Sequence, residues 1–462
     1  MDIKKFSHFR FAVLAAIFTF VLQSAAGQAP GVPNSEEIVS KVNEYMSAAE
    51  PIDRFSGTIL VARDGKVIVS KGYGMANYEW GIPNTPQTVF RLGSITKQFT
   101  SAAIMLLQER GKLNVGDAAC KYISDCPPAW EPITIKQLLS HTAGIPNYTS
   151  FPDFAKKAIM PVSTGELLAE YKSKPLDFAP GEKYNYSNSG YHLLGLIIEK
   201  ASGKSYTDFL QDNIFTPLGM KQTGYDSHEN LIKWRAAGYA RKGDGFVNAA
   251  YMDMLIPYAA GALYSTTGDL LLWDQALYTE KLLTRKSLDE MFTPVKGNYA
   301  YGWGVGKRGN HASISHGGGI YGFATHIARY PDDRVTVVVL SNVEGASAGA
   351  VSSNLSAIAF GEPYTLPKER KAIVLPSQTL DKYVGEYQLL PNATITVTNE
   401  AGKLFMLLTG RQQNLELFPE SENDFFLKVV DAQIKFETDA SGKVTRLIFK
   451  QGGSVIPAPK IK

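Results

Sequence analysis

A serine and a lysine three positions apart, Ser94 and Lys97, are the two residues in this sequence best suited to covalent chemistry. They stand at the start of a helical pattern over residues 96–110, and side chains three apart on a helix face the same way. A serine hydroxyl becomes a good nucleophile when a neighbour accepts its proton. A lysine can accept that proton if burial or nearby positive potential keeps some of its amine neutral. The pair also arises by chance on surface helices, so it predicts a nucleophile only together with other elements.

Tyr186 and Asn188 form a second element, in a polar loop just before an apolar helical pattern over residues 191–198. A phenol can relay protons to a leaving group, and an asparagine can donate a hydrogen bond to a substrate carbonyl or to Lys97. The alternative is a structural role, in which the tyrosine covers the core and Asn188 caps the following helix.

The third element is the run His316, Gly317, Gly318 and Gly319, which follows a strand pattern over residues 312–315. Glycines beside a strand allow a substrate to approach the backbone closely. We expect His316, Gly317 and Gly318 to contact the substrate. We expect the N–H of Gly319 to join that of the serine in an oxyanion hole. The alternative is a loose turn with a surface histidine.

In this order the three elements resemble the S-x-x-K, Y-x-N and K-T-G motifs of the serine β-lactamase and penicillin-binding-protein superfamily. The segments 90–97, 138–146 and 178–191 resemble the branch of class C β-lactamases, D-alanyl-D-alanine carboxypeptidases, D-aminopeptidases and related esterases. The resemblance extends over residues 36–360. The tail from residue 380 resembles the small lipocalin-like β domain often appended to these hydrolases.

This resemblance implies a serine hydrolase that forms an acyl-enzyme on Ser94 and cleaves an amide or ester in a D-amino-acid peptide, an ester or a β-lactam. It implies catalytic roles for Lys97, Tyr186, Asn188 and Gly319, a small-molecule or peptide substrate, and neither a metal nor an organic cofactor. Whether Lys97 or Tyr186 is the general base stays open. The alternative function is a penicillin-binding or sensor protein that is acylated without turnover.

One departure from the family pattern bears on the substrate. Where the β-lactamases of the family have K-T-G, this chain has His316, Gly317 and Gly318. The family's lysine recognises a substrate carboxylate, whereas a histidine is mostly neutral at pH 7 and Gly317 offers no hydroxyl. The resemblance therefore implies a peptidase or esterase more than an efficient β-lactamase.

Two other kinds of hydrolase fit the sequence less well. Residues 345–349 match the G-x-S-x-G elbow of α/β-hydrolases around Ser347, but that mechanism needs a histidine later in the chain. Every histidine precedes Ser347. The sequence also has no H-E-x-x-H motif, and we expect His141 and His192 to pack or hydrogen-bond locally.

The element patterns predict an α/β fold for residues 30–362. Strand patterns at 55–62 and 66–71 form a hairpin, and further strand patterns occur at 324–328 and 335–340. Helical patterns occupy most of the region between. These patterns indicate a sheet completed by N- and C-terminal segments and flanked by helices, with an inserted helical lobe. The resemblance implies that this sheet is β-lactamase-like and antiparallel.

A second domain is predicted at the C-terminal end of the chain. Prolines punctuate a linker at residues 363–376, and short strand patterns separated by turn residues follow over residues 377–462. This alternation is typical of a small all-β domain whose sheet is closed or nearly closed as a barrel.

Residues 1–27 have the layout of a signal peptide, with basic residues, an apolar run and then small residues; Ala26 and Ala29 precede candidate cleavage sites. We therefore expect a periplasmic or secreted protein with no stable membrane anchor after cleavage. Cys120 and Cys126 are the only cysteines, and in an oxidising compartment they form one local disulfide. The formal net charge is +3, without a basic run that would bind nucleic acid.

Overall fold

The computed structural model describes residues 33–462, apart from residues 53 and 244 and the stretches 391–392, 410–413, 429–431 and 452–453. The predicted signal peptide, residues 1–27, lies outside the described residues. Across the described part of the chain, no helix is both long and apolar enough to cross a membrane.

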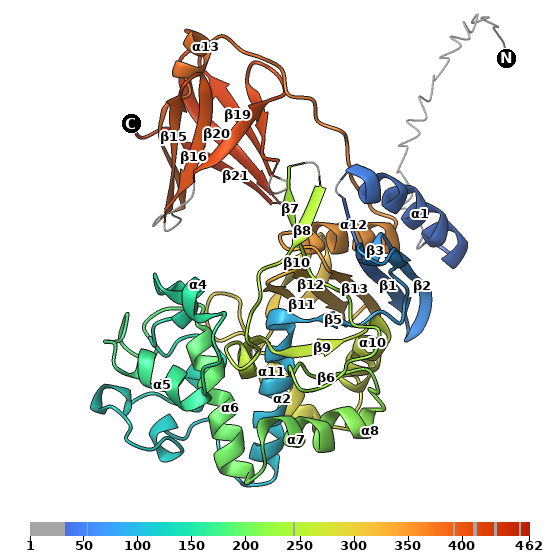
Figure 1. Cartoon of the computed structure of the whole chain (residues 1–462), viewed down its shortest axis with the longest axis vertical. Helices are drawn as coiled ribbons and strands as arrows, with labels where there is room; N and C mark the ends of the chain where they lie inside the picture. The colour runs from blue at the N-terminus through green and yellow to red at the C-terminus, as the bar shows by residue number, and fades with distance from the viewer. Residues whose placement is uncertain are drawn as a thin grey trace, which may run out of the picture.

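A six-stranded antiparallel sheet of order β10-β11-β12-β13-β1-β2 organises the larger part of the molecule (Figure 1). The inner strands β1 and β13 pair with each other, and nearly all of their residues are buried. Strands from both ends of the predicted first domain thus complete one sheet, which confirms the predicted fold class. In sheet order the strands are Gly304–Arg308, His311–Ile320, Phe323–Tyr330, Val335–Ser341, Gly57–Arg63 and Lys66–Tyr73.

Successive side chains along a strand point to opposite faces of the sheet. Because buried apolar side chains lie on both faces, helices cover both. On β1, Val61 packs into a core with helices α1 and α12, whereas Leu60 packs into a second core with α2 and α10. These four helices are α1 (Ser35–Ile52), α12 (Ala348–Phe360), α2 (Thr96–Glu109) and α10 (Thr267–Ala276).

The helical lobe is built from short helices, several of which begin at a side-chain cap. Thr134 and Ser163 each form a capping box, with Gln137 and Glu166 respectively, which satisfies free N–H groups at the helix starts. The α-helices of this region are α3 (Ile135–Leu139), α4 (Phe154–Lys157), α5 (Thr164–Lys172), α6 (Asn188–Ser202), α7 (Tyr206–Leu210), α8 (Thr216–Leu218), α9 (Tyr258–Gly261) and α11 (Arg285–Phe292).

Short strands and single helical turns connect these helices, and the sequence patterns did not predict them. Elements of two to four residues are too short to show a hydrophobic period. The strands are β3 (Met75–Asn77), β4 (Ile82–Pro83), β5 (Phe90–Arg91), β6 (Gly224–Tyr225), β7 (Tyr239–Lys242), β8 (Gly245–Asn248) and β9 (Leu263–Ser265). The turns are η1 (Gly93–Ile95), η2 (Ala119–Lys121), η3 (Pro128–Trp130), η4 (Tyr148–Ser150) and the π-helical η5 (Gln211–Phe215).

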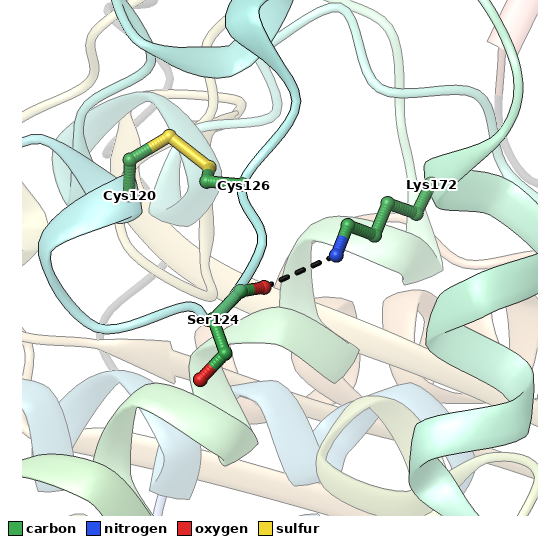
Figure 2. The surroundings of a disulfide bond; sticks show 4 residues. All are labelled: Cys120, Ser124, Cys126 and Lys172. Atoms are coloured by element: carbon green, nitrogen blue, oxygen red, sulfur yellow. Dashed lines mark hydrogen bonds between the residues drawn. A yellow bond between two sulfur atoms is a disulfide. The ribbon is translucent and has the colours of Figure 1, made fainter.

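The structure joins Cys120 and Cys126 in a disulfide, with 5.4 Å between their Cα atoms. Figure 2 shows that the loop which it closes also contacts α5, because Lys172 Nζ donates a hydrogen bond to the carbonyl oxygen of Ser124 at 3.1 Å. The bridge therefore supports a surface loop of the helical lobe.

The C-terminal part is an eight-stranded antiparallel sheet that is nearly closed as a barrel, as predicted. The first and last strands approach each other: Glu386 N–H donates to Lys462 O at 3.1 Å, and Ile461 N–H donates to Glu386 O at 2.8 Å. Buried rings of Tyr383, Tyr387 and Phe436 pack inside. The elements are α13 (Ser377–Asp381), β14 (Gly385–Leu390), β15 (Ala393–Glu400), β16 (Lys403–Leu408), β17 (Leu415–Pro419), β18 (Asp424–Phe426), β19 (Ala432–Thr438), β20 (Val444–Gln451) and β21 (Ser454–Pro459).

The segment between the two parts, residues 362–376, has neither helix nor strand. Its first half is held by the larger part, since Tyr364 OH donates to Glu44 at 2.8 Å. Its second half is held by the barrel, where Ile373 N–H donates to Pro419 O at 2.8 Å. The two parts have separate hydrophobic cores.

Candidate active site

Ser94 and Lys97 meet at the start of α2, as the three-residue spacing predicts. Ser94 lies in the single turn η1, and Lys97 lies in the first turn of α2 behind it. Lys97 Nζ is 3.0 Å from Ser94 Oγ. Ser94 is partly exposed, whereas Lys97 is fully buried, so a substrate can reach the hydroxyl while the amine stays away from water.

Two further acceptors surround the amine of Lys97. The side-chain oxygen of Asn188 and the backbone carbonyl of Ala260 each lie 2.8 Å from Nζ. Neither oxygen can donate a hydrogen bond. A neutral amine has two N–H groups and one lone pair, so when Asn188 and Ala260 take both N–H groups, the lone pair is left for the hydroxyl proton of Ser94.

The surroundings of Lys97 favour this neutral form. Burial lowers the pKa of Lys97 well below its ordinary value, because a charged amine is costly in a water-poor interior. The rings of Tyr186 and Tyr191 lie 4.8 and 5.4 Å from Nζ, and ring faces stabilise the protonated amine. The site can therefore hold the lysine as a base and tolerate the charge after proton transfer.

The side chain of Tyr186 lies beside this pair, and its pKa is shifted in the opposite direction to that of Lys97. Burial raises the pKa of Tyr186 well above the ordinary 10.0, and Ser94 is the polar neighbour that partly offsets the rise. Its buried hydroxyl oxygen has no hydrogen-bond partner among the described residues. A phenol that keeps its proton and has no partner is suited to donate that proton to a group on the substrate.

The backbone of Gly319 lies against the turn that carries Ser94. A Cβ atom added to Gly93 would lie 2.9 Å from Gly319 N and 3.0 Å from Gly319 O, so the backbone of Gly319 lies in close contact with the turn. β11 pairs with β10 only as far as Ser315, which leaves this part of the strand edge open. The geometry allows an oxyanion hole between the N–H groups of Ser94 and Gly319.

The glycine run lies inside β11 rather than beside a strand, which corrects the predicted end of the strand at residue 315. Gly318 is required by packing: a Cβ there would lie 1.9 Å from Leu92 O. At Gly319 a Cβ would have nothing within 4 Å. Gly318 thus serves close packing of the strand against the turn before Ser94. The sequence pattern ended the strand early because glycine is a poor strand former.

The contacts of His316 fit a neutral ring with its proton on Nδ1. Its Nδ1 lies 2.6 Å from Gly317 O, which can only accept, so Nδ1 carries the proton and Nε2 accepts from Tyr299 O–H at 2.9 Å. Burial first, and the charge of Lys97 second, lower the pKa of His316 to about 3. His316 therefore supplies no positive charge for a substrate carboxylate at neutral pH.

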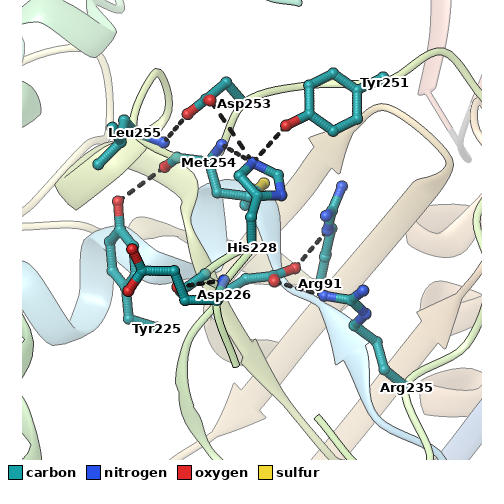
Figure 3. A network of polar contacts seen from close by, with 11 residues as sticks. Arg91, Tyr225, Asp226, His228, Arg235, Tyr251, Asp253, Met254 and Leu255 are labelled. Atoms are coloured by element: carbon teal, nitrogen blue, oxygen red, sulfur yellow. Dashed lines mark hydrogen bonds and ion pairs between the residues drawn. The ribbon is translucent and has the colours of Figure 1, made fainter. Parts of the chain in front are cut away.

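A polar network holds the segment that presents Ala260 (Figure 3). Asp226 is buried and pairs with Arg91 at 2.5 Å and with Arg235 at 2.6 Å. Its backbone N–H donates to Ala262 O at 2.8 Å. His228 Nε2 accepts from the N–H of Met254 at 3.3 Å in the same segment. This network therefore contacts the chain on both sides of Ala260, at Met254 and at Ala262.

The remaining predicted features lie elsewhere. Ser347 is the N-cap of α12, on the sheet face opposite to α2, so it does not share the site with Ser94. Among the residues that the structure describes, no group of three His, Cys, Asp or Glu could hold a metal ion. His192 packs locally as expected, with Nδ1 2.8 Å from Tyr171 OH.

Three contributors to the site were missed in the sequence. The carbonyl of Ala260 has no sequence signal, because every residue has one. Tyr299 reaches His316 from a loop whose position depends on the tertiary fold. His141 belongs to the segment 138–146, whose resemblance to the family was the only available signal for a role beyond local packing.

Comparisons with known proteins show which family this chain resembles over most of its length. The Beta-lactamase family model matches residues 47–358, and a domain of unknown function, DUF3471, matches residues 369–459. Penicillin-binding protein 4* of Bacillus subtilis (strain 168) is 31% identical over 433 residues, covering 86% of this chain and 94% of the relative. Teichoic acid D-alanine hydrolase of Staphylococcus aureus is 28% identical over 339 residues, covering 68% and 79%.

Among solved structures, the octameric penicillin-binding protein homologue from Pyrococcus abyssi has a TM-score of 0.65 at 26% identity, covering 91% of this chain and 99% of that chain. The fold and these similarities define a serine hydrolase. The chain belongs to the β-lactamase family, together with penicillin-binding-protein homologues, which confirms the resemblance seen in the motifs.

Proposed function

We propose that this protein is an exported serine hydrolase that forms an acyl-enzyme on Ser94 and cleaves an amide or ester bond. The observation that supports it most is the set of three contacts around Lys97 Nζ, to Ser94, Asn188 and Ala260. Two of these partners can only accept, so they direct the lone pair of the neutral amine to the serine hydroxyl.

In the proposed acylation step, Ser94 Oγ attacks the substrate carbonyl carbon and its proton passes to Lys97. The N–H groups of Ser94 and Gly319 stabilise the oxyanion, a contribution of about 2.7–4 kcal/mol for one donor. Tyr186 protonates the leaving group as the bond to the acyl carbon breaks, and Lys97 then returns a proton to Tyr186. In deacylation, water attacks the acyl carbon and loses a proton to Lys97, the bond from the acyl carbon to Ser94 Oγ breaks, and Lys97 passes that proton to Ser94 Oγ. The opposite pKa directions of Lys97 and Tyr186 support Lys97 as the base in acylation.

The proposed substrate class is a D-amino-acid ester or amide, such as a D-alanyl ester, ahead of a β-lactam. One relative is named teichoic acid D-alanine hydrolase, which supports the D-alanyl ester. The neutral His316 supports a substrate that does not need a positive partner for a carboxylate. His316, Gly317 and Gly318 remain our candidates for contact with the substrate along the open edge of β11.

For the organisation of the chain, we assign residues 1–27 to a signal peptide, 30–362 to the hydrolase domain, 363–376 to a linker and 377–462 to the lipocalin-like β domain. The separate hydrophobic cores support this division. The signal peptide implies a periplasmic or secreted protein.

Hydrolysis of N-acetyl-D-alanine esters by the purified mature protein tests the proposal. We expect multiple turnovers by the wild type, none by Ser94→Ala, and unchanged turnover by the control Ser347→Ala. The second candidate function, a penicillin-binding or sensor protein, is supported by the similarity to penicillin-binding protein 4*. It predicts one acylation for each molecule of protein, with no further release of alcohol.

A further inference from the structure

His141 contacts the chain on both sides of Tyr186. Its backbone carbonyl accepts a hydrogen bond from the N–H of Asn185 at 2.9 Å. Its side-chain Nδ1 accepts a second hydrogen bond, from the N–H of Ser187 at 3.1 Å. Since these two residues flank Tyr186 in the sequence, one histidine holds a backbone N–H group on each side of the tyrosine.

The imidazole of His141 also contacts the tyrosine side chain itself. Its ring centroid is 4.2 Å from that of Tyr186 and 4.7 Å from that of Tyr299. Tyr186 is therefore held by His141 at three points, one on the backbone of each neighbouring residue and one on its own ring. Its hydroxyl, which has no hydrogen-bond partner among the described residues, depends on these contacts for its position.

Holding His141 in this arrangement has a structural cost. Its φ is +57°, a left-handed conformation that L-residues rarely adopt. Its Nε2 is buried and has no hydrogen-bond partner among the described residues. Strained backbone and unpaired buried groups persist where the surroundings enforce them, and they concentrate at functional sites.

The hydrogen bond to Ser187 also fixes the charge of His141. Because Nδ1 accepts, the proton of the neutral ring is on Nε2. Burial holds the pKa of His141 well below its ordinary value. In a protonated ring, the Nδ1–H of His141 and the N–H of Ser187 would be two donors facing each other. The hydrogen bond to Ser187 therefore requires a neutral imidazole.

From these contacts we propose that His141 is a positioning residue, which aims the Tyr186 hydroxyl at the leaving group of the substrate. This inference rests on the proposed function, in which Tyr186 acts as the general acid. His141 itself transfers no proton in the reaction, and its effect on the rate passes entirely through Tyr186.

Two N-acetyl-D-alanine esters separate this role from a purely structural one. A p-nitrophenyl ester has a leaving group that needs no proton, whereas an alkyl ester needs one. Because the acyl group is the same, kcat/KM for the two esters differs only in acylation. The variants are His141→Ala, His141→Asn, Tyr186→Phe and the double variant His141→Ala/Tyr186→Phe, each checked for an unchanged thermal unfolding midpoint.

We expect His141→Ala to lower kcat/KM for the alkyl ester by roughly 100-fold, the effect of misplacing a reacting group by about 1 Å. The loss with the p-nitrophenyl ester should be less than about threefold. In the Tyr186→Phe background His141→Ala should add almost nothing, because groups that act as a unit are non-additive. Asparagine tolerates positive φ and offers an oxygen near the position of Nδ1, so His141→Asn should recover most of the activity.

Equal losses on both esters, or a full additional loss in the Tyr186→Phe background, would overturn the inference and leave the proposed function intact. If His141→Ala fails to fold, the same two comparisons are made with His141→Asn, for which a small but leaving-group-dependent loss is expected. By contrast, Tyr186→Phe with full alkyl-ester activity, or a wild type that hydrolyses neither ester, contradicts the proposed function itself.

Discussion

The proposed chemistry depends on one buried lysine whose partners are all oxygens. Lys97 contacts the nucleophile Ser94, the amide of Asn188 and the carbonyl of Ala260. The residue types and spacing in the sequence predicted the first two contacts, since both belong to recognised motifs. The third could not be predicted, because a backbone carbonyl is placed by the tertiary fold and not by residue type.

Replacing Lys97 with methionine should remove the proton acceptor while it keeps the length and apolar stem of the side chain. We expect kcat/KM to fall by about 10²–10⁴-fold, the usual contribution of a general base. Ester hydrolysis measures the change, and Lys172→Met is the matched control because Lys172 bonds only the disulfide loop. Near-normal activity of Lys97→Met would assign proton acceptance to another group.

The pH dependence of kcat/KM follows from the two pKa directions. Lys97 must be neutral to act, and burial lowers its pKa well below 10.5, so activity is gained as the pH rises through that lowered value. Tyr186 must be protonated, and its pKa is raised above 10.0, so activity is lost only above that pH. We expect a plateau at neutral and moderately alkaline pH; activity that first appears above pH 10 would contradict the account.

At the scale of elements, the sequence predicted the hairpin, the sheet and the main helices, because each shows a clear hydrophobic period. It missed the continuation of β11 through His316 and the glycines, where residue type argues against a strand. The packing of Gly318 against Leu92 explains why glycine is nevertheless present. In the C-terminal sheet, short strands such as β18 (Asp424–Phe426) carry too few residues for a recognisable pattern.

The glycines of β11 give a matched pair of variants. Gly318→Ala places a Cβ 1.9 Å from Leu92 O, so we expect a loss of about 1–3 kcal/mol in the free energy of unfolding together with lower activity. Gly319→Ala meets nothing within 4 Å and keeps its backbone N–H, so its stability should stay at the wild-type value. Urea denaturation of both variants measures the difference, and equal stabilities would contradict the packing argument.

At the scale of the whole molecule, two bodies with separate cores share one chain. Truncation after residue 366 should therefore leave a folded hydrolase whose kcat/KM on small esters stays within about threefold of the full chain. Circular dichroism and the ester assay test this. Loss of activity with the fold retained would show that the barrel contributes to the site.

Buried neutral histidines make the stability of the molecule sensitive to acid. Burial lowers the pKa of His192 and His316 to about 3 and that of His326 to about 4. The unfolded chain binds these protons near the ordinary pKa of 6.5, and the folded chain does not. Stability should fall as the pH drops below 6.5, by about 1.4 kcal/mol per pH unit for a fully buried group such as His192. Thermal unfolding at pH 7 and pH 5 measures the effect, and an unchanged midpoint would argue against neutral burial.

The central claim is that Ser94 is the nucleophile, and covalent labelling tests it most directly. The purified mature protein is incubated with a fluorophosphonate probe, and the modified residue is mapped by peptide mass spectrometry, with Ser94→Ala as the control. We predict one label per molecule on Ser94 and none on the control. Labelling at Ser347, or labelling of Ser94→Ala to the same extent as the wild type, would contradict it.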